Sequence, residues 1–538
     1  MATLGFRALC STLLLCGPAA SALASLDDAE VLIQQELRRH QETPPHPTDR
    51  RHSHSAHPDH AAAAEAATCP SLPRPLHYPY DKYEGVYNGM TVQWSDSEFA
   101  EAAVRGRQGA YEQLAPLLRK LQKGKTLRIV VFGGSSTAGM HCEQHTARFK
   151  ESGGCSKTAG KPCMVHETII AKECSWPRRF QHWLQYAFPN AKIELDNFAQ
   201  GAATSSSILV GSGIMMKAYN FDKNDRGADI IFVDTLVNDV YQWQKDWGQD
   251  QKRTMDMSTN AAMAFEQVVR TLHALQPKAV IFPVLSGCNL CWSQGGGHRQ
   301  VIDHYNLPRL DWGQFVAWKQ NLWDGPDAHP NYWVHQSIAD VLAAVWGSAW
   351  NQECQSRFTR KVGHLDWSTS YFPPEALSTF QPCLDPRSAY DASVPETTKG
   401  VQLGEGWSLY EDRPGKPGWI SERSGARIAF PLRFGKHPAL VITWMRSYEN
   451  MGYATVELNN FKYHLDGLWT EGLHENVTLA HSRWLQVDRP RIQPMATEEM
   501  GVAGFSIFPW QNMTMVIENS LDHTVKHPKM KILQVFTC

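Results

Sequence analysis

Between Leu127 and Trp346, short apolar runs alternate with stretches that carry apolar residues at helical spacing. Runs such as LRIVVF at 127–132 and ADIIFV at 228–233 are apolar apart from Arg128 and Asp229, as is typical of strands covered on both faces. A chain that alternates strand and helix in this way folds into a parallel sheet between two layers of helices. The expected strands are 127–132, 192–198, 228–233 and 279–285, and the expected helices are 99–121, 180–188, 205–219, 261–275 and 334–346.

The C-terminal region has a different pattern. Its short apolar runs are separated by Gly, Pro and Asn turns, with no helical stretches of comparable length between them. Such a series predicts an antiparallel β-sandwich. A turn-rich bridge at 350–400 comes before it. The expected strands are 428–434, 439–444, 454–458, 462–465, 504–508, 513–518 and 532–536.

The N-terminal region has the features of a targeting segment followed by a linker. One charge, Arg7, precedes a short apolar stretch, and Ala22-Leu23-Ala24 is a small-x-small cleavage motif. An uncleaved signal anchor is the weaker alternative. Next comes a His-rich segment with little to bury, which favours a disordered stem over a metal site. We therefore divide the chain into a signal peptide (1–24), a largely disordered stem (25–95), an α/β domain (96–349), a bridge (350–400) and a β-sandwich accessory domain (401–538).

Charge and cysteine content restrict the partners and the compartment. A formal net charge of −2 gives no electrostatic reason to expect nucleic-acid binding. Without the leader the cysteine number is even, as in disulfide-bonded secreted proteins, and Cys288-Asn-Leu-Cys291 fits a disulfide better than a redox or zinc motif. Asn476 and Asn512 begin glycosylation sequons. The ten cysteines outside the leader are Cys69, Cys142, Cys155, Cys163, Cys174, Cys288, Cys291, Cys354, Cys383 and Cys538.

Ligands of open α/β sheets bind beyond the carboxyl ends of the strands, so the residues that follow each expected strand are the candidates for chemistry. The first strand is followed by GGSSTAG, in which glycines flank Ser135 and permit a sharp turn that exposes its hydroxyl. A phosphate-binding loop is the alternative, but the chain has no GxxxxGK[ST] motif here. A plain turn is the other alternative.

Three later segments offer matching groups. Gly201 follows the second strand and lets a backbone N–H approach a substrate, and Asn238 follows the third strand and offers an amide. Either residue alone is more often a turn or a helix cap. His329 stands on a Gly/Pro-rich loop beside Asp324 and Asp327, where a histidine is well placed to act as a base.

In chain order, these four segments resemble the blocks of the SGNH (GDSL-like) hydrolases, which contain a serine, a glycine, an asparagine and a histidine. The resemblance covers about 127–346 and implies a three-layer α/β/α, flavodoxin-like fold. It also implies Ser135 as nucleophile, His329 as general base, and the amides of Ser135 and Gly201 with the Asn238 side chain as oxyanion hole. The family chemistry requires no metal and no organic cofactor, and none is expected here.

Some positions depart from the family pattern. Gly134 stands where the family usually has Asp, and Leu236 stands where it usually has Gly. Pro326 occupies the usual Asp position before the histidine, so Asp327, or alternatively Asp324, is expected to orient His329. Ser136 is a weaker alternative nucleophile, because the match in register falls on Ser135.

The sequence therefore predicts a secreted serine esterase, in the secretory lumen or at the cell surface, that acts on carbohydrate O-acetyl or similar small acyl esters. The trailing β-domain weakly resembles those of some eukaryotic secreted members. One alternative is an O-acyltransferase acting on glycans, and another is a non-catalytic glycan-binding protein on an esterase scaffold. Trp407, Trp419, Trp444 and Trp469 could stack on sugar rings, although a core position is the stronger expectation for each. The expected partner is a glycan-linked ester. No segment of the chain is expected to span a membrane.

Overall fold

The chain divides into two units, Met1–Ala67 and Thr68–Cys538, and every residue described below belongs to the second. The expected signal peptide and most of the stem lie outside the described residues. The computed structural model describes residues 71–73, 97, 100–101, 103–104, 109–140, 142, 174–218, 227–239, 251–286, 296–312, 330, 332–356, 359, 361, 363, 365–377, 386–412, 416–436, 438–459, 461–468, 478–486, 507–520 and 529–538.

The first part of the second unit is built on a parallel sheet with strand order β2-β1-β3-β4-β5. This order is the flavodoxin-like arrangement, so the predicted fold class is confirmed. Because β1 lies between β2 and β3, the segments that follow these three strands emerge side by side at one edge of the sheet. The strands are β1 (Leu127–Gly133), β2 (Ile193–Asn197), β3 (Ile230–Asp234), β4 (Val280–Leu285) and β5 (Leu310–Asp311).

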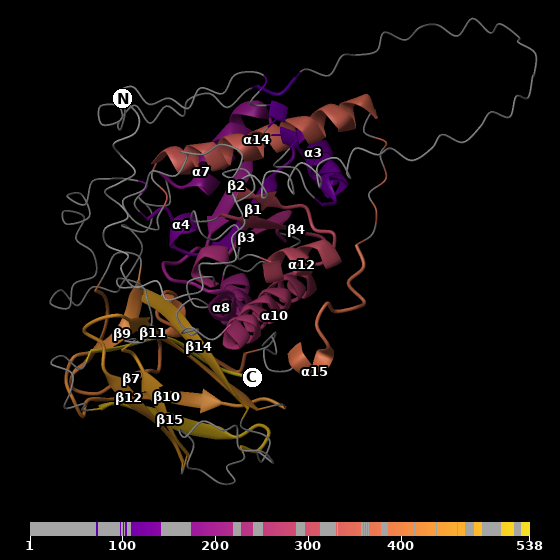
Figure 1. The fold of residues 1–538 in the computed structure, drawn as a ribbon. Helices are drawn as coiled ribbons and strands as arrows, with labels where there is room; N and C mark the ends of the chain where they lie inside the picture. Colours follow the sequence, from indigo (N-terminus) through magenta and orange to yellow (C-terminus); the bar gives the residue numbers. More distant parts are fainter. Residues whose placement is uncertain are drawn as a thin grey trace, which may run out of the picture. The chain divides into compact units, whose positions relative to one another are not determined.

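Helices cover both faces of this sheet, as Figure 1 shows. Successive residues of β1 face opposite sides, so Ile129 and Val131 join one apolar core and Val130 and Phe132 join the other. The first core is completed by α3 (Ala115–Gln122), α7 (Trp176–Ala187) and α14 (Tyr332–Gln355), and the second by α8 (Ser205–Ala218), α10 (Gln251–Leu275) and α12 (Gly296–His304).

The predicted helix over 99–121 is wrong at its centre. Gly109 has a φ of +79°, which a helix does not contain, and only after it do η2 (Tyr111–Leu114) and α3 follow. A side chain at this position would lie 1.9 Å from the Leu307 carbonyl oxygen, so the backbone passes too close for any residue but glycine. The short elements α12 and β5 were not predicted, and α10 and α14 are longer than expected.

The second part is an antiparallel β-sandwich, as predicted. One sheet has the order β13-β12-β15-β10-β7, and the other has the order β14-β11-β16-β9-β8, with β6 paired to β16. Alternate residues of the strands fill one core between the sheets. The strands are β6 (Ser388–Asp391), β7 (Gln402–Leu403), β8 (Trp407–Glu411), β9 (Pro417–Ser421), β10 (Arg427–Arg433), β11 (Ala439–Ser447), β12 (Tyr453–Leu458), β13 (Phe461–Asp466), β14 (Thr478–Gln486), β15 (Asn512–Ser520) and β16 (Met530–Thr537).

Several details of the sandwich differ from the sequence prediction. The strands β6 to β9 and β14 were missed, whereas Ile507 and Phe508, at the end of the predicted strand 504–508, lie outside any strand. Trp407, Trp419 and Trp444 are buried core residues, which confirms the expectation for these three. Trp469 lies outside the described residues. In the part of the chain that is described, no helix has the length and apolar character needed to cross a bilayer.

Candidate functional site

The loop after β1 turns sharply and carries Ser135 at the carboxyl edge of the sheet. Gly134 is extended, α4 (Ser135–Ala138) forms a single turn, and Gly139 ends it with a φ of +85°. The Gly134 N–H donates to the Asp234 carbonyl at 3.0 Å, and the Gln200 N–H donates to the Gly133 carbonyl at 3.0 Å. The loop is thus tied to the ends of both neighbouring strands. Ser135 is the first residue of the turn, so the turn itself does not use its N–H.

The two glycines before Ser135 are required by close packing. A Cβ on Gly133 would lie 2.7 Å from Thr137 Cβ and 2.9 Å from the Asp234 carbonyl oxygen. A Cβ on Gly134 would lie 2.3 Å from Asn238 Nδ2, so any side chain there would displace this amide. Leu236, the second departure from the family pattern, is buried in the core between the sheet and α8, α10 and α12.

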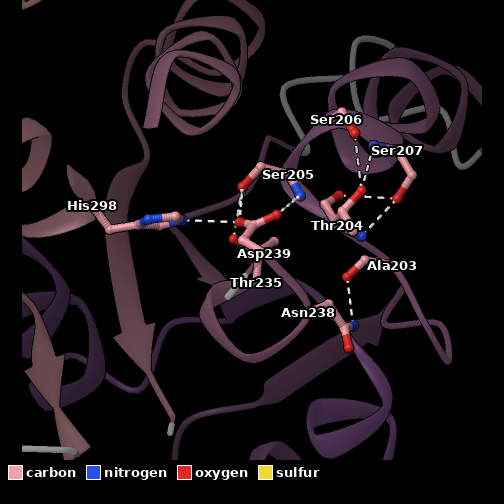
Figure 2. A network of polar contacts seen from close by, with 9 residues as sticks. All are labelled: Ala203, Thr204, Ser205, Ser206, Ser207, Thr235, Asn238, Asp239 and His298. Carbon is pink, nitrogen blue, oxygen red and sulfur yellow. Dashed lines mark hydrogen bonds and ion pairs between the residues drawn. The ribbon is translucent and has the colours of Figure 1, made fainter. Parts of the chain in front are cut away.

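Asn238 comes after β3 and reaches across to the segment after β2. Its Nδ2 donates to the Ala203 carbonyl at 2.7 Å, and the residue is 7% exposed (Figure 2). A side-chain amide nitrogen carries two hydrogens, so the bond to Ala203 uses only one of them. The structure therefore brings Asn238 next to the Ser135 loop, as the sequence predicted. Ser136 is as deeply buried as Ser135, at 4% and 6% exposed.

The segment after β2 carries Gly201 at a tight contact. A Cβ on Gly201 would lie 2.4 Å from Lys416 Cε and 3.1 Å from Met140 Sδ, so the lysine stem fills the space above this glycine. The next residue, Ala202, has a φ of +74°, a left-handed conformation that costs an L-residue about 1 kcal/mol or more. The Lys416 stem occupies the side of Gly201 to which a Cβ would point, and the approach of a substrate to the Gly201 N–H stays a prediction from the sequence.

The predicted base and its partners lie outside the described residues. This holds for His329, Asp327, Asp324 and Pro326, whereas the adjacent Pro330 is described and buried. The pairing of His329 with Ser135 therefore stays a prediction from the sequence.

A buried polar network, which the sequence analysis did not predict, lies directly beside Asn238. Asp239 Oδ2 lies 2.9 Å from His298 Nε2 and accepts from Ser205 Oγ at 2.6 Å, while Oδ1 accepts from the Ser205 N–H at 2.9 Å (Figure 2). Thr235 Oγ1 lies 2.8 Å from Ser205 Oγ. The carboxylate stands between serine and histidine, so Ser205 and His298 do not form a nucleophile–base pair. The network instead joins α8, α12 and the segment that carries Asn238.

A second buried carboxylate lies under the Ser135 loop. Asp234 Oδ2 accepts from Thr137 Oγ1 and from Ser286 Oγ at 2.5 Å, and the residue is 3% exposed. Burial raises the pKa of Asp234 from 3.8 to about 7, and the hydrogen bonds from Ser286 and Thr137 offset part of this rise. The one-turn helix with Ser135 therefore rests on a carboxyl group that titrates near neutral pH.

The covalent features expected of an exported protein are present in part. Cys142 and Cys174 form a disulfide with Cα atoms 5.9 Å apart. Cys354 and Cys538 each take part in a further disulfide, with partners outside the described residues. Asn512 is exposed at the start of β15, where a glycan is sterically possible. Asn476 lies outside the described residues. Among the described residues, no group of three or more His, Cys, Asp and Glu side chains is placed to hold a metal ion.

Replacing Asp234 with Asn should change how stability depends on pH. The folded chain keeps the Asp234 proton up to about pH 7, whereas the unfolded chain releases it near pH 3.8. The free energy of unfolding of the native chain should therefore fall between these values as the pH rises. Relative to Asp234→Asn, the fall should be on the order of 4 kcal/mol in urea titrations at stepped pH.

Ser286→Ala serves as a companion variant in the same titrations. It removes a hydrogen bond that favours the charged carboxylate, so the upper limit of the pH window should move above 7. A difference between the native chain and Asp234→Asn that is independent of pH would contradict the assignment.

Replacing Gly201 with Ala should cost stability through the clash with Lys416. The lysine end is flexible, so the cost should be about 1 kcal/mol, at the low end for overpacking. In a Lys416→Ala background the same substitution should cost much less, because the obstructing atoms are gone. Urea unfolding of the four chains gives the coupling free energy. Equal costs of Gly201→Ala in both backgrounds would show that Lys416 does not occupy the space above Gly201.

No protein-family model matches the chain, and no curated protein matches it. The chain is similar to the solved structure of a two-domain esterase active on acetylated mannans, at 14% identity and a TM-score of 0.48, over 81% of this chain and 97% of that one. It is also similar to a psychrotrophic esterase from Pseudoalteromonas, at 14% identity and a TM-score of 0.28, over 42% and 98%. A third is an acetyl xylan esterase from Geobacillus stearothermophilus, at 13% identity and a TM-score of 0.26, over 42% and 94%. At these identities the similarities assign the chain to no family.

Proposed function

We propose that this chain is a secreted serine esterase of SGNH type that removes small acyl groups, such as acetyl, from carbohydrates. The observation that supports this most strongly is the position of Asn238 Nδ2, which packs against Gly134 directly before Ser135. A hydroxyl nucleophile and a side-chain N–H donor then share one buried corner at the carboxyl edge of the sheet. Acyl transfer needs these two groups within reach of one carbonyl.

In the proposed reaction, Ser135 Oγ attacks the ester carbonyl while His329 takes the hydroxyl proton. His329 then gives this proton to the leaving sugar oxygen, and water releases the acyl group from Ser135 by the reverse sequence. The carboxylate of Asp327, or alternatively Asp324, holds the imidazole in the required tautomer. The amides of Ser135 and Gly201 and the side chain of Asn238 stabilise the oxyanion. The mechanism uses side chains and backbone alone.

The proposed substrate class rests on sequence features that are typical of exported proteins. The leader, the sequons at Asn476 and Asn512 and the even number of cysteines are typical of exported proteins, whose surroundings are rich in glycans. Since Trp407, Trp419 and Trp444 are core residues, they offer no stacking surface for sugars. We therefore place the sugar-binding part of the site beside the Ser135 loop, not on these tryptophans.

A fluorophosphonate probe, which labels activated serines, tests the nucleophile. The purified full chain should be labelled at Ser135, as read by mass spectrometry of the modified peptide. Labelling should be absent in Ser135→Ala and reduced to background in His329→Ala, because the hydroxyl is a weak nucleophile without its base. Ser136→Ala is the matched control and should keep most of the labelling.

Three other outcomes would each redirect the assignment. Labelling at Ser136 would move the nucleophile by one residue. Labelled protein that transfers acetyl groups to added sugars faster than it hydrolyses them would identify an acyltransferase. Folded native protein that binds glycans and is not labelled between acid and alkaline pH would overturn the enzyme proposal.

Asn238→Ala should lower kcat by about 10²–10³ with little change in KM, because an oxyanion donor acts mainly in the transition state. Hydrolysis of a chromogenic acetyl ester gives both constants. Asn519→Ala is the control, since Asn519 is equally an internal asparagine, fully buried in the sandwich. Its loss should affect stability but not kcat. A kcat for Asn238→Ala within threefold of the native value would remove Asn238 from the oxyanion hole.

A further inference from the structure

The loop after β2 is bonded to the outer edge of the β-sandwich. In the described part of the sandwich, β14 lies at the end of its sheet, paired on one side with β11. On its other side, the Ala480 N–H donates to the Ala202 carbonyl at 3.1 Å, and the Ala480 carbonyl accepts from Thr204 Oγ1 at 3.4 Å. An exposed strand edge offers such unpaired backbone groups, and here the loop occupies them.

Ala202, which accepts the hydrogen bond from Ala480, has a strained backbone conformation. Ala202 has its φ at +74° and is 2% exposed. Its methyl group belongs to a small apolar cluster with Met445 of β11 and Met451, which follows β11. Backbone and side chain of Ala202 are therefore both fixed by the sandwich. A left-handed alanine persists only where its surroundings hold it in place.

The neighbours of Ala202 are held from the same side. The stem of Lys416, just before β9, fills the space over Gly201, and Lys416 is 9% exposed. Gln200 Nε2 donates to Ser393 Oγ at 2.6 Å, beyond the end of β6. Gln200, Gly201, Ala202 and Thr204 thus each contact the β-sandwich directly.

The same loop is bonded on its opposite side to the candidate catalytic groups. The Gln200 N–H donates to the Gly133 carbonyl at 3.0 Å, two residues before Ser135. The Ala203 carbonyl accepts from Asn238 Nδ2 at 2.7 Å and so fixes the position of this amide. One short loop therefore lies between the sandwich and two of the three expected oxyanion donors, and it supplies the third from Gly201.

We propose that the β-sandwich is the positioning element of the oxyanion hole, acting through the hydrogen bond from Ala480 to Ala202 and the contact of Ser393 with Gln200. This inference rests on the proposed esterase function. Ala480 and Ser393 are positioning residues that act through the loop and touch no substrate. The sandwich then contributes to catalysis without supplying any reacting group, by holding Gly201 and Asn238 where the developing charge appears.

Ala480→Pro in the full chain tests the proposal. Proline is tolerated on a strand edge when its missing N–H faces away from the ladder, so the pairing of β14 with β11 is kept. The substitution removes the donor to Ala202. We expect kcat for a chromogenic acetyl ester to fall about tenfold, with KM and the fluorophosphonate-labelled residue unchanged, since one hydrogen bond no longer holds the loop. Ala480→Gly keeps the N–H and should stay within about threefold of the native kcat.

Ser393→Ala is a second variant that disturbs folding less. It removes the acceptor of Gln200 and also the hydroxyl that donates to Asp391 Oδ1 at 2.6 Å, so it should lower kcat about threefold with a small fall in melting temperature. The control is Ser520→Ala, which removes a similar hydroxyl contact, to Thr455, in the other sheet of the sandwich. Its kcat should equal that of the native chain.

The proposal would be overturned if folded Ala480→Pro and Ser393→Ala had a lower melting temperature but the native kcat. That result would assign these contacts to stability alone. Equal kcat in Ala480→Pro and Ala480→Gly would also overturn it. Failure of the esterase function itself is distinguishable, because the native chain would then show no labelling at Ser135 and no turnover. If Ala480→Pro does not fold, Ser393→Ala against Ser520→Ala decides the question.

Discussion

The close contact between Asn238 and Gly134, directly before Ser135, is the constraint on which the candidate site depends. A Cβ on Gly134 would lie 2.3 Å from the Asn238 amide nitrogen, so the Asn238 side chain can reach this position only because residue 134 is a glycine. The contact is possible because β1 and β3 are adjacent in the sheet and the Gly134 N–H is bonded to the last residue of β3. The absence of a side chain at Gly134 thus allows Asn238 to lie close to Ser135.

Much of the α/β architecture could be predicted from the sequence because its strands carry their signal locally. The runs that form β1, β3 and β4 are apolar apart from Arg128 and Asp234, and they are buried on both faces in the structure, with only Arg128 half-buried. The interruption at Gly109 could not be predicted in the same way, because its cause is the Leu307 carbonyl, which is distant in sequence. The strands β5 and β7 have two residues each and are too short to show any period.

For the candidate site too, residues with a local sequence signal could be predicted and residues defined by distant contacts could not. Ser135, Gly201 and Asn238 could be found because each follows an expected strand, and the sheet order places those strand ends together. The Asp239–His298 pair, the Asp234 carboxyl group with its raised pKa, and Lys416 over Gly201 were missed. Each of these results from contacts between distant segments, and burial gives the charged groups properties that no local pattern indicates. Asp239 directly follows Asn238, and an acidic residue beside a candidate site residue was the available signal.

The position of β16 in its sheet has a consequence for how the chain folds during synthesis. β16 pairs with β11, β9 and β6, all of which precede it in the chain, so the most central strand of that sheet is made after its neighbours. The parallel sheet can assemble from segments that leave the ribosome in succession, whereas in the sandwich sheet the β11–β14 and β8–β9 pairs are joined to each other only when β16 arrives. Contacts of this kind, far apart in sequence, make folding slow and expose strand edges to other chains. Chaperone dependence should therefore concentrate in the sandwich and not in the α/β region.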